Sequence, residues 1–192
     1  MICLTSTISS ISEMDQIDQY LSDIAQSGCK SALEQLYRCT KDAVYGYALS
    51  ILKNTHDTED VLHDCYITIY HSAFRYVCTG KPLAWILTIT RNLCLGKLRS
   101  RGRLSAFPKE DWERYLETND RISMEDRIVL VHCLKDLSDE EREILLLHVL
   151  SGMKHREIAA MTGRPVSTIL SKYHRALKKL RGHLKEGDRT NG

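Results

Sequence analysis

The chain contains few of the residues that interrupt helices: its 192 residues include only three prolines and ten glycines. Long segments between them carry apolar residues at helical spacing, so the sequence predicts an almost entirely helical protein. It has no run of about 18 apolar residues, and we therefore expect no transmembrane helix. The N-terminal stretch lacks the basic start of a signal peptide and turns acidic toward Asp18, which argues against secretion.

Paired metal and thiol motifs are also missing. The seven cysteines form no Cys-x-x-Cys pair, and the eight histidines include no His-Glu-x-x-His motif. An odd number of scattered cysteines is typical of reduced thiols in the cytosol rather than of a disulfide framework. The sequence therefore predicts a cytoplasmic protein with no cofactor and no metal. A thiol or metal enzyme would need clustered ligands that this spacing does not supply.

The charge of the chain is concentrated rather than spread. The formal net charge is only +2, yet residues 164–185 contain seven Lys or Arg and no Asp or Glu. Gly163 and Pro165 predict a turn before this segment, with Ser167 or Thr168 capping the helix that follows. That helix carries apolar residues at steps of three and four, namely Ile169, Tyr173, Ala176, Leu177, Leu180 and Leu184. The pattern predicts a helix-turn-helix whose basic second helix enters a DNA groove; the alternative is a solvated amphipathic helix.

The residues predicted to contact DNA duplex lie in the turn and on the polar face of the basic helix. Hydroxyl groups and cations near a helix N-terminus can bind phosphates and base edges in the major groove. These candidates are Arg164, Ser167, Thr168, Ser171, Lys172, Arg175 and Lys179.

A second charged feature is acidic. Asp57, Glu59, Asp60 and Asp64 lie close together, and no Lys or Arg occurs from residue 55 to 73. We expect Asp57 to cap a helix here, and acidic residues in a first turn stabilise a helix through its dipole. The same one-sided cluster would also suit docking to a basic partner. The residues alone leave both readings open.

Residues 71–82 are predicted to form a loop that carries Phe74, Arg75, Tyr76 and Lys81. Pro82 then suits the first turn of another helix, whose far end is basic. Aromatic and cationic side chains around a loop can stack on unpaired bases and hold phosphates. Burial of the aromatic rings in the core is the alternative, particularly for Trp85.

These segments together predict an all-α fold of two small helical domains joined by a flexible linker, the second domain being the helix-turn-helix. We expect a disordered tail at 1–12, a first domain at 13–104, a linker at 105–123, a second domain at 124–186 and a tail at 187–192. Within the second domain, a helix is predicted at 124–137. Ser138 and Glu141 then form the capping box of the next helix.

Four motifs, in this order, resemble those of bacterial RNA polymerase sigma factors of the sigma-70 family, in the small extracytoplasmic-function subfamily. They are the segment 28–37, DTEDVLHDCY at 57–66, KPLAWILTITRN at 81–92 and REIAAMTGRPVSTILSKYHRALKKL at 156–180. The resemblance spans residues 14–104 and 124–184. It implies a non-enzymatic subunit that directs promoter-specific transcription initiation, with core RNA polymerase and promoter DNA as partners.

The resemblance also implies a role for each group of candidates. The largest polymerase subunit would bind Asp57, Glu59, Asp60, His63, Asp64 and Tyr66. The −10 element would be opened and one flipped base held by Phe74, Arg75, Tyr76, Lys81, Trp85, Arg91, Asn92 and Arg99, and the basic helix-turn-helix would read the −35 element. Several residues depart from the family pattern; in the basic helix, Leu170 replaces a cation and Lys172 replaces an arginine.

One other function remains open at this stage. A stand-alone helix-turn-helix regulator would bind duplex DNA without polymerase, but it would not need the acidic helix and aromatic loop of the first domain. The resemblance also makes an anti-sigma factor a candidate partner.

Overall fold

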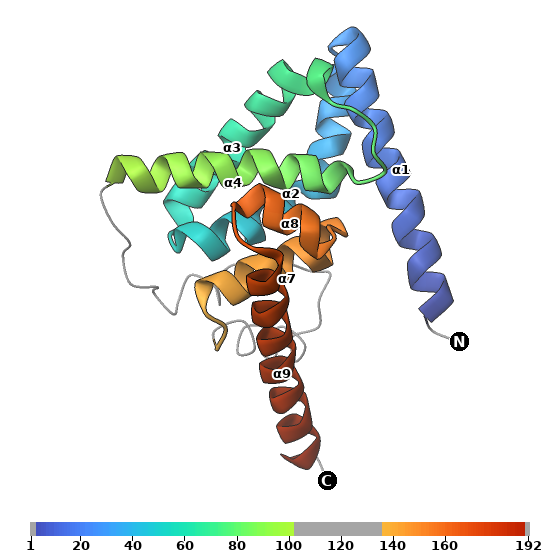
Figure 1. Cartoon of the computed structure of the whole chain (residues 1–192). Coiled ribbons are helices and arrows are strands. Elements are labelled where there is room, and N and C mark those ends of the chain that lie inside the picture. The colour runs from blue at the N-terminus through green and yellow to red at the C-terminus, as the bar shows by residue number, and fades with distance from the viewer. Residues whose placement is uncertain (1–2, 102–135, 191–192) are drawn as a thin grey trace.

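The computed structural model of the chain describes residues 3–101 and 136–190, with side chains at 14–100 and 136–182. Every element in these ranges is helical, which confirms the predicted all-α fold for this part of the chain (Figure 1). The elements are α1 (Cys3–Ser27), α2 (Lys30–Leu52), α3 (Thr55–Ser72), the 3-10 turn η1 (Ala73–Arg75), α4 (Pro82–Arg101), α7 (Asp139–Ser151), α8 (His155–Thr162) and α9 (Val166–Thr190).

The breaks between the first three helices lie at Gly28 and at Lys53 and Asn54. α1 ends at Ser27, and Gly28 takes a φ of 62°, a region that glycine enters without steric cost. α2 ends before Lys53, which has a φ of 54°. α3 is capped by Asn54, because its side-chain oxygen accepts a hydrogen bond of 2.9 Å from the backbone N–H of Asp57. The prediction that Asp57 is the cap was therefore wrong by three residues.

Three other boundaries differ from the predictions. α1 is helical from Cys3, so the predicted disordered tail is wrong for residues 3–12. α9 begins at Val166, which places Ser167 and Thr168 inside the helix rather than at its cap, and it continues to Thr190. The predicted linker at 105–123 and nearly all of the predicted helix at 124–137 lie outside the described residues.

The two predicted domains pack against each other. α7 lies against both α2 and α4, and α9 packs on α7 and α8 near its N-terminus and projects away from them toward its C-terminus (Figure 1). One hydrophobic cluster contains fully buried residues of both halves, among them Leu36, Tyr47, Ile86, Ile144 and Leu147. The apolar stripe of α7 therefore completes the core of the first four helices as well as that of its own domain, which a reading of each helix by itself does not reveal.

The capping box of α7 is present as predicted. Ser138 Oγ accepts from the Glu141 N–H at 3.3 Å, and Glu141 Oε2 accepts from the Ser138 N–H at 2.9 Å. Ser138→Ala is expected to lower the free energy of unfolding by about 1 kcal/mol, the usual value of such a cap. Thermal or urea unfolding measures this. Ser72→Ala is the control, because Ser72 Oγ only donates back to the carbonyl of Thr68 within α3; an equal loss in both variants would contradict the assignment.

Candidate functional site

The exposed surface of α3 carries part of the predicted polymerase-binding set. Glu59, His63 and Asp64 are exposed, and Ile67 beside them keeps 45% of its surface in solvent. Asp60 is half-exposed and its Oδ2 lies 2.6 Å from Lys97 Nζ of α4. Two acids without a positive neighbour on α3, next to an exposed aliphatic side chain, form a surface suited to a partner that is both basic and apolar.

Two residues of that set are buried instead. The Asp57 side chain is 4% exposed in the first turn of α3, with Lys97 Nζ at 3.6 Å. The Tyr66 ring packs edge-on against Tyr37, and its hydroxyl lies 2.7 Å from Thr40 Oγ1. Burial raises the pKa of the Tyr66 hydroxyl far above its ordinary value. Both residues therefore hold α3 in place rather than contribute to its exposed surface.

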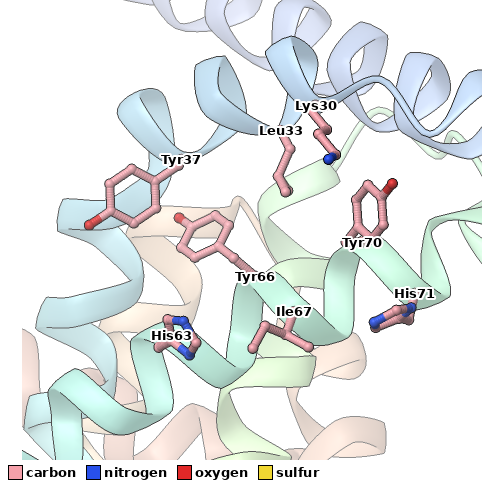
Figure 2. Close-up of a pocket in the computed structure, with 8 residues that line it drawn as sticks. All are labelled: Lys30, Leu33, Tyr37, His63, Tyr66, Ile67, Tyr70 and His71. Atoms are coloured by element: carbon pink, nitrogen blue, oxygen red, sulfur yellow. The ribbon is translucent and has the colours of Figure 1, made fainter.

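A pocket of about 430 Å³ opens between α2 and α3 and includes His63 and Ile67 of the exposed α3 surface (Figure 2). Its lining is mainly apolar and includes His63, which the sequence had placed in the polymerase-binding set. The residues around it are Lys30, Leu33 and Tyr37 of α2 and His63, Tyr66, Ile67, Tyr70 and His71 of α3. Sequence reasoning missed this pocket, because its walls come from two helices whose relative placement is not visible in either one.

Some of the predicted −10 residues are exposed, and others pack against neighbouring residues of the chain. Phe74 keeps 67% of its surface exposed, and the Arg75 guanidinium lies 5.1 Å from the centre of its ring. Asn92 and Arg99 of α4 are also exposed. Tyr76 and Trp85 pack against each other with ring centres 5.1 Å apart, and the Tyr76 hydroxyl donates to Asp18. The half-burial of Trp85 agrees with the alternative that its ring belongs to the core.

The helix-turn-helix forms as predicted from α8, the turn at Gly163 and α9. Gly163 has a φ of 69°, and the N–H groups of Thr168 and Ile169 both donate to the Pro165 carbonyl. Ile158, Ala159 and Ile169 are buried and fix α8 against α9. This packing leaves Ser167, Ser171 and Arg175 exposed on α9.

Some of the other predicted −35 residues form ion pairs within the chain or are half-buried. Lys172 pairs with Glu140, and Lys179 Nζ lies 2.7 Å from Glu141 Oε2, so both cations turn toward α7. Thr168 is half-buried. The hydrogen bond and charge of Lys172 lower the pKa of Glu140. Burial alone would raise the pKa of Glu141, but Lys179 and the Ser138 amide outweigh it and lower that pKa.

Further cations of both predicted DNA-binding sets form ion pairs with acids of α7 and α8. Some of these pairs join the first half of the chain (residues 14–100) to the second half (residues 136–182). Glu143 of α7 accepts from Arg91 Nε of α4 at 2.8 Å and from Arg164 Nη1 at 2.9 Å. Lys81 Nζ donates to Glu157 Oε2 of α8 at 2.6 Å. The side chains of Arg91 and Glu143 are each only 12% exposed, which strengthens their attraction relative to a surface pair. Sequence reasoning predicted these cations but missed the acids that hold them.

Matches to known proteins agree with this geometry in both halves. Residues 36–104 match the description "Sigma-70 region 2", and residues 127–180 match "Sigma-70, region 4". The chain belongs to the sigma-70 family. Within it, the chain is an RNA polymerase sigma factor of the extracytoplasmic-function type. A region 2 match across α2 to α4, in addition to the helix-turn-helix, distinguishes a sigma factor from a stand-alone regulator.

Two relatives and two solved structures illustrate the similarity. The sigma factor SigK of Mycobacterium ulcerans is 27% identical over 177 residues, covering 88% of this chain and 94% of SigK. SigE of Mycolicibacterium smegmatis is 32% identical over 158 residues, covering 79% of this chain and 61% of SigE. RpoE of Bartonella quintana, solved with its anti-sigma factor NepR, aligns with a TM-score of 0.57 at 22% identity, covering 79% of this chain and 96% of RpoE. CnrH, solved with the cytosolic domain of CnrY, aligns with a TM-score of 0.53 at 23% identity, covering 91% and 97%.

The thiols of this sigma factor show no pairing in the described residues: Cys29, Cys39, Cys65, Cys78 and Cys94 are all free. Burial raises the pKa of Cys65 to about 11, which keeps that thiol protonated at neutral pH. Within the same residues, no group of three or more His, Cys, Asp or Glu is arranged to hold a metal ion. No helix among them is long and apolar enough to cross a membrane.

A cluster of aromatic rings in region 4 gives a pH prediction. The rings of His148 and His155 stack at 5.0 Å, and the Tyr173 ring lies edge-on 4.9 and 4.7 Å from them. Burial, followed by the nearby His148 and His174, lowers the pKa of His155 below its ordinary 6.5. The unfolded chain therefore binds a proton at His155 more readily than the folded chain does.

The stabilisation linked to His155 is complete above pH 6.5 and is lost as the pH falls below that value. We expect a lower urea midpoint at pH 5.5 than at pH 7.5 and a smaller difference in His155→Phe. The same variant at His56, an exposed histidine of α3, is the control. An unchanged pH difference in His155→Phe would contradict the prediction.

Proposed function

We propose that this sigma factor binds core RNA polymerase through the exposed surface of α3 and directs promoter-specific initiation through two DNA-binding surfaces. The observation that carries the proposal is the combination, in one chain, of an exposed acidic surface on α3 and an outward-facing polar surface on α9. The first lies within the region 2 match and the second within the region 4 match.

The proposed polymerase contact consists of Glu59, Asp60, His63 and Asp64 together with the pocket beside them. A basic amphipathic helix of the largest polymerase subunit would place cations against the acids and an apolar side chain in the pocket. Interfaces commonly combine an apolar anchor in a pocket with charges around it. Asp57 and Tyr66 would act indirectly, by holding α3 in the position that this contact requires.

The proposed −10 contact is made by Phe74, Arg75, Asn92 and Arg99, which are exposed. Phe74 can stack on an unpaired base, and the cations can hold the backbone of the melted strand. Tyr76 and Trp85 would hold the 71–82 segment in place, through their mutual contact and the hydrogen bond that Tyr76 donates to Asp18. Lys81 and Arg91 would join this surface once they leave Glu157 and Glu143.

The proposed −35 contact is centred on Ser167, Ser171 and Arg175 of α9. Arg175 Nη2 lies 3.5 Å from Ser171 Oγ, so its guanidinium projects from the same strip as the two hydroxyls. Arg164, Thr168, Lys172 and Lys179 flank that strip and suit phosphates. The chain would contribute no catalytic step of its own, since the polymerase performs the chemistry. It would act in the cytoplasm, where core polymerase is found, and an anti-sigma factor is a further candidate partner, as NepR is for RpoE.

The test is reconstituted transcription. Core polymerase from the source organism, with and without the purified chain, is incubated with a library of genomic fragments, and the transcripts are sequenced. We expect transcripts with defined start sites only when the chain is present, and a shared motif upstream of those sites. Tight binding of the free chain to duplex, without any polymerase-dependent transcript, would contradict the proposal and favour a stand-alone regulator.

A further inference from the structure

Two aliphatic side chains are exposed on the DNA-facing half of α9. Val166 and Leu170 each keep 37% of their surface in solvent, whereas Ile169 between them is fully buried. They are four residues apart, so they lie one above the other on consecutive turns of the helix. Apolar side chains in this position are unexpected if the surface has only to hold phosphates.

The contacts of α9 fix where this aliphatic pair lies. Ile169 anchors one side of the helix in the core. Lys172 pairs with Glu140 on the flank that faces α7. Ser167 and Ser171 follow Val166 and Leu170 by one position each, so the hydroxyls and the aliphatic pair form adjacent strips. The N-terminal turns of α9 therefore present a polar strip bordered on one side by an apolar one.

Thymine is the only base that presents a methyl group in the major groove. Valine and leucine have no donor or acceptor, so they cannot discriminate bases by hydrogen bonding, but they can exclude water from a methyl group. We propose that Val166 and Leu170 read thymines in the −35 element by packing against their C5-methyl groups. This inference rests on the proposed function and adds to it the kind of base that one side of α9 selects.

The expected size of the effect is small but measurable. Burying one methyl-sized group contributes about 0.8 kcal/mol, which corresponds to a factor of about four in affinity. Replacing thymine by uracil removes only that methyl group and leaves every hydrogen-bonding atom in place. The substitution therefore isolates the proposed contact from all others on α9.

The experiment uses holoenzyme, formed from core polymerase and the full chain, in two stages. First, a duplex library randomised over the −35 region is selected for holoenzyme binding. The enriched sequence is then remade with uracil at each thymine in turn. We expect one or two positions where uracil weakens binding by about three- to fivefold, and where 5-methylcytosine binds better than cytosine.

Variants connect those positions to the two side chains. Leu170→Ala should weaken binding to the thymine duplex and abolish the difference between thymine and uracil at one position, and Val166→Ala should do so at another. Leu170→Met keeps an apolar contact and should keep the difference. Val149→Ala removes an aliphatic side chain of 66% exposure from α7 and is the matched control.

Two outcomes would overturn the inference: indifference of the wild-type holoenzyme to uracil at every thymine, or an undiminished uracil effect in both alanine variants. Failure of the proposed function looks different, because no −35 sequence would then be enriched in the first stage. Circular dichroism of each variant shows whether the helix-turn-helix remains folded.

Discussion

The double charge reversal Glu59→Lys with Asp64→Lys is expected to weaken binding to core RNA polymerase by about 100-fold or more and to leave the fold intact. Both side chains are exposed on α3. Close charge pairs across a protein interface are worth about 1.5–7 kcal/mol each, so reversing two of them should remove nearly all binding. Pull-down or fluorescence titration with core polymerase measures the loss.

The control places the same charge change on another helix. Asp15→Lys with Asp23→Lys alters two acids of α1, outside the proposed contact, and should preserve binding. We chose Glu59 and Asp64 over Asp60, because reversing Asp60 would also break its ion pair with Lys97. If the α3 variant bound polymerase as tightly as the wild type, the proposed contact would have to be abandoned.

Glu143→Lys is expected to raise the affinity of the free chain for promoter duplex by about tenfold. In the described structure, Glu143 holds Arg91 of region 2 and Arg164 of region 4 together in a mostly buried cluster. Leaving like charges in such a site costs about 3–5 kcal/mol, which should separate α7 from α4. Arg91, Arg164 and Lys81 would then be available to DNA phosphates. The gain in affinity cannot exceed the reciprocal of the fraction of wild-type molecules in which α7 is already separated from α4.

Glu34→Lys is the matched control for this experiment. Glu34 pairs with Arg38 on the exposed surface of α2, so the variant adds the same positive charge without touching the contact between the two halves. Fluorescence anisotropy with duplex DNA gives the affinity, and small-angle scattering gives the radius of gyration. We expect both to rise in Glu143→Lys only. Equal affinities for the two variants would mean that the added charge alone attracts DNA.

The sequence predicted individual helices well, because their limits depend on a few residues. Gly163 lies in the predicted turn with a positive φ, and Ser138 begins a helix, as expected. Asn54 was overlooked as a cap because Asp57 is an equally good cap residue by type, and only the backbone conformation separates them. The extension of α1 to Cys3 was missed because Ser and Thr are weak helix formers in isolation.

The surroundings of the predicted site residues could not be read from the sequence. Several cations of the two predicted DNA-binding sets pair with acids of the chain, and Glu140, Glu143 and Glu157 carried no sequence signal as their partners. Such pairs join residues up to 76 positions apart, and only the packing of the helices brings them together: α8 against the start of α4 for Lys81 and Glu157, and α9 against α7 for Lys172 and Glu140. Burial of Tyr66 and Asp57 follows from the same cause, since it depends on which side of α3 meets α2 and α4.

The ion pairs between the two halves also determine how the free chain responds to salt. Dissolved ions compete with Glu143 and Glu157 for their cationic partners, so added salt favours separation of the halves. The same ions compete with the chain for DNA phosphates, which weakens binding in proportion to the number of contacts. Because the two steps respond in opposite directions, the free chain should show a shallower dependence of DNA affinity on salt concentration than its phosphate contacts alone would give.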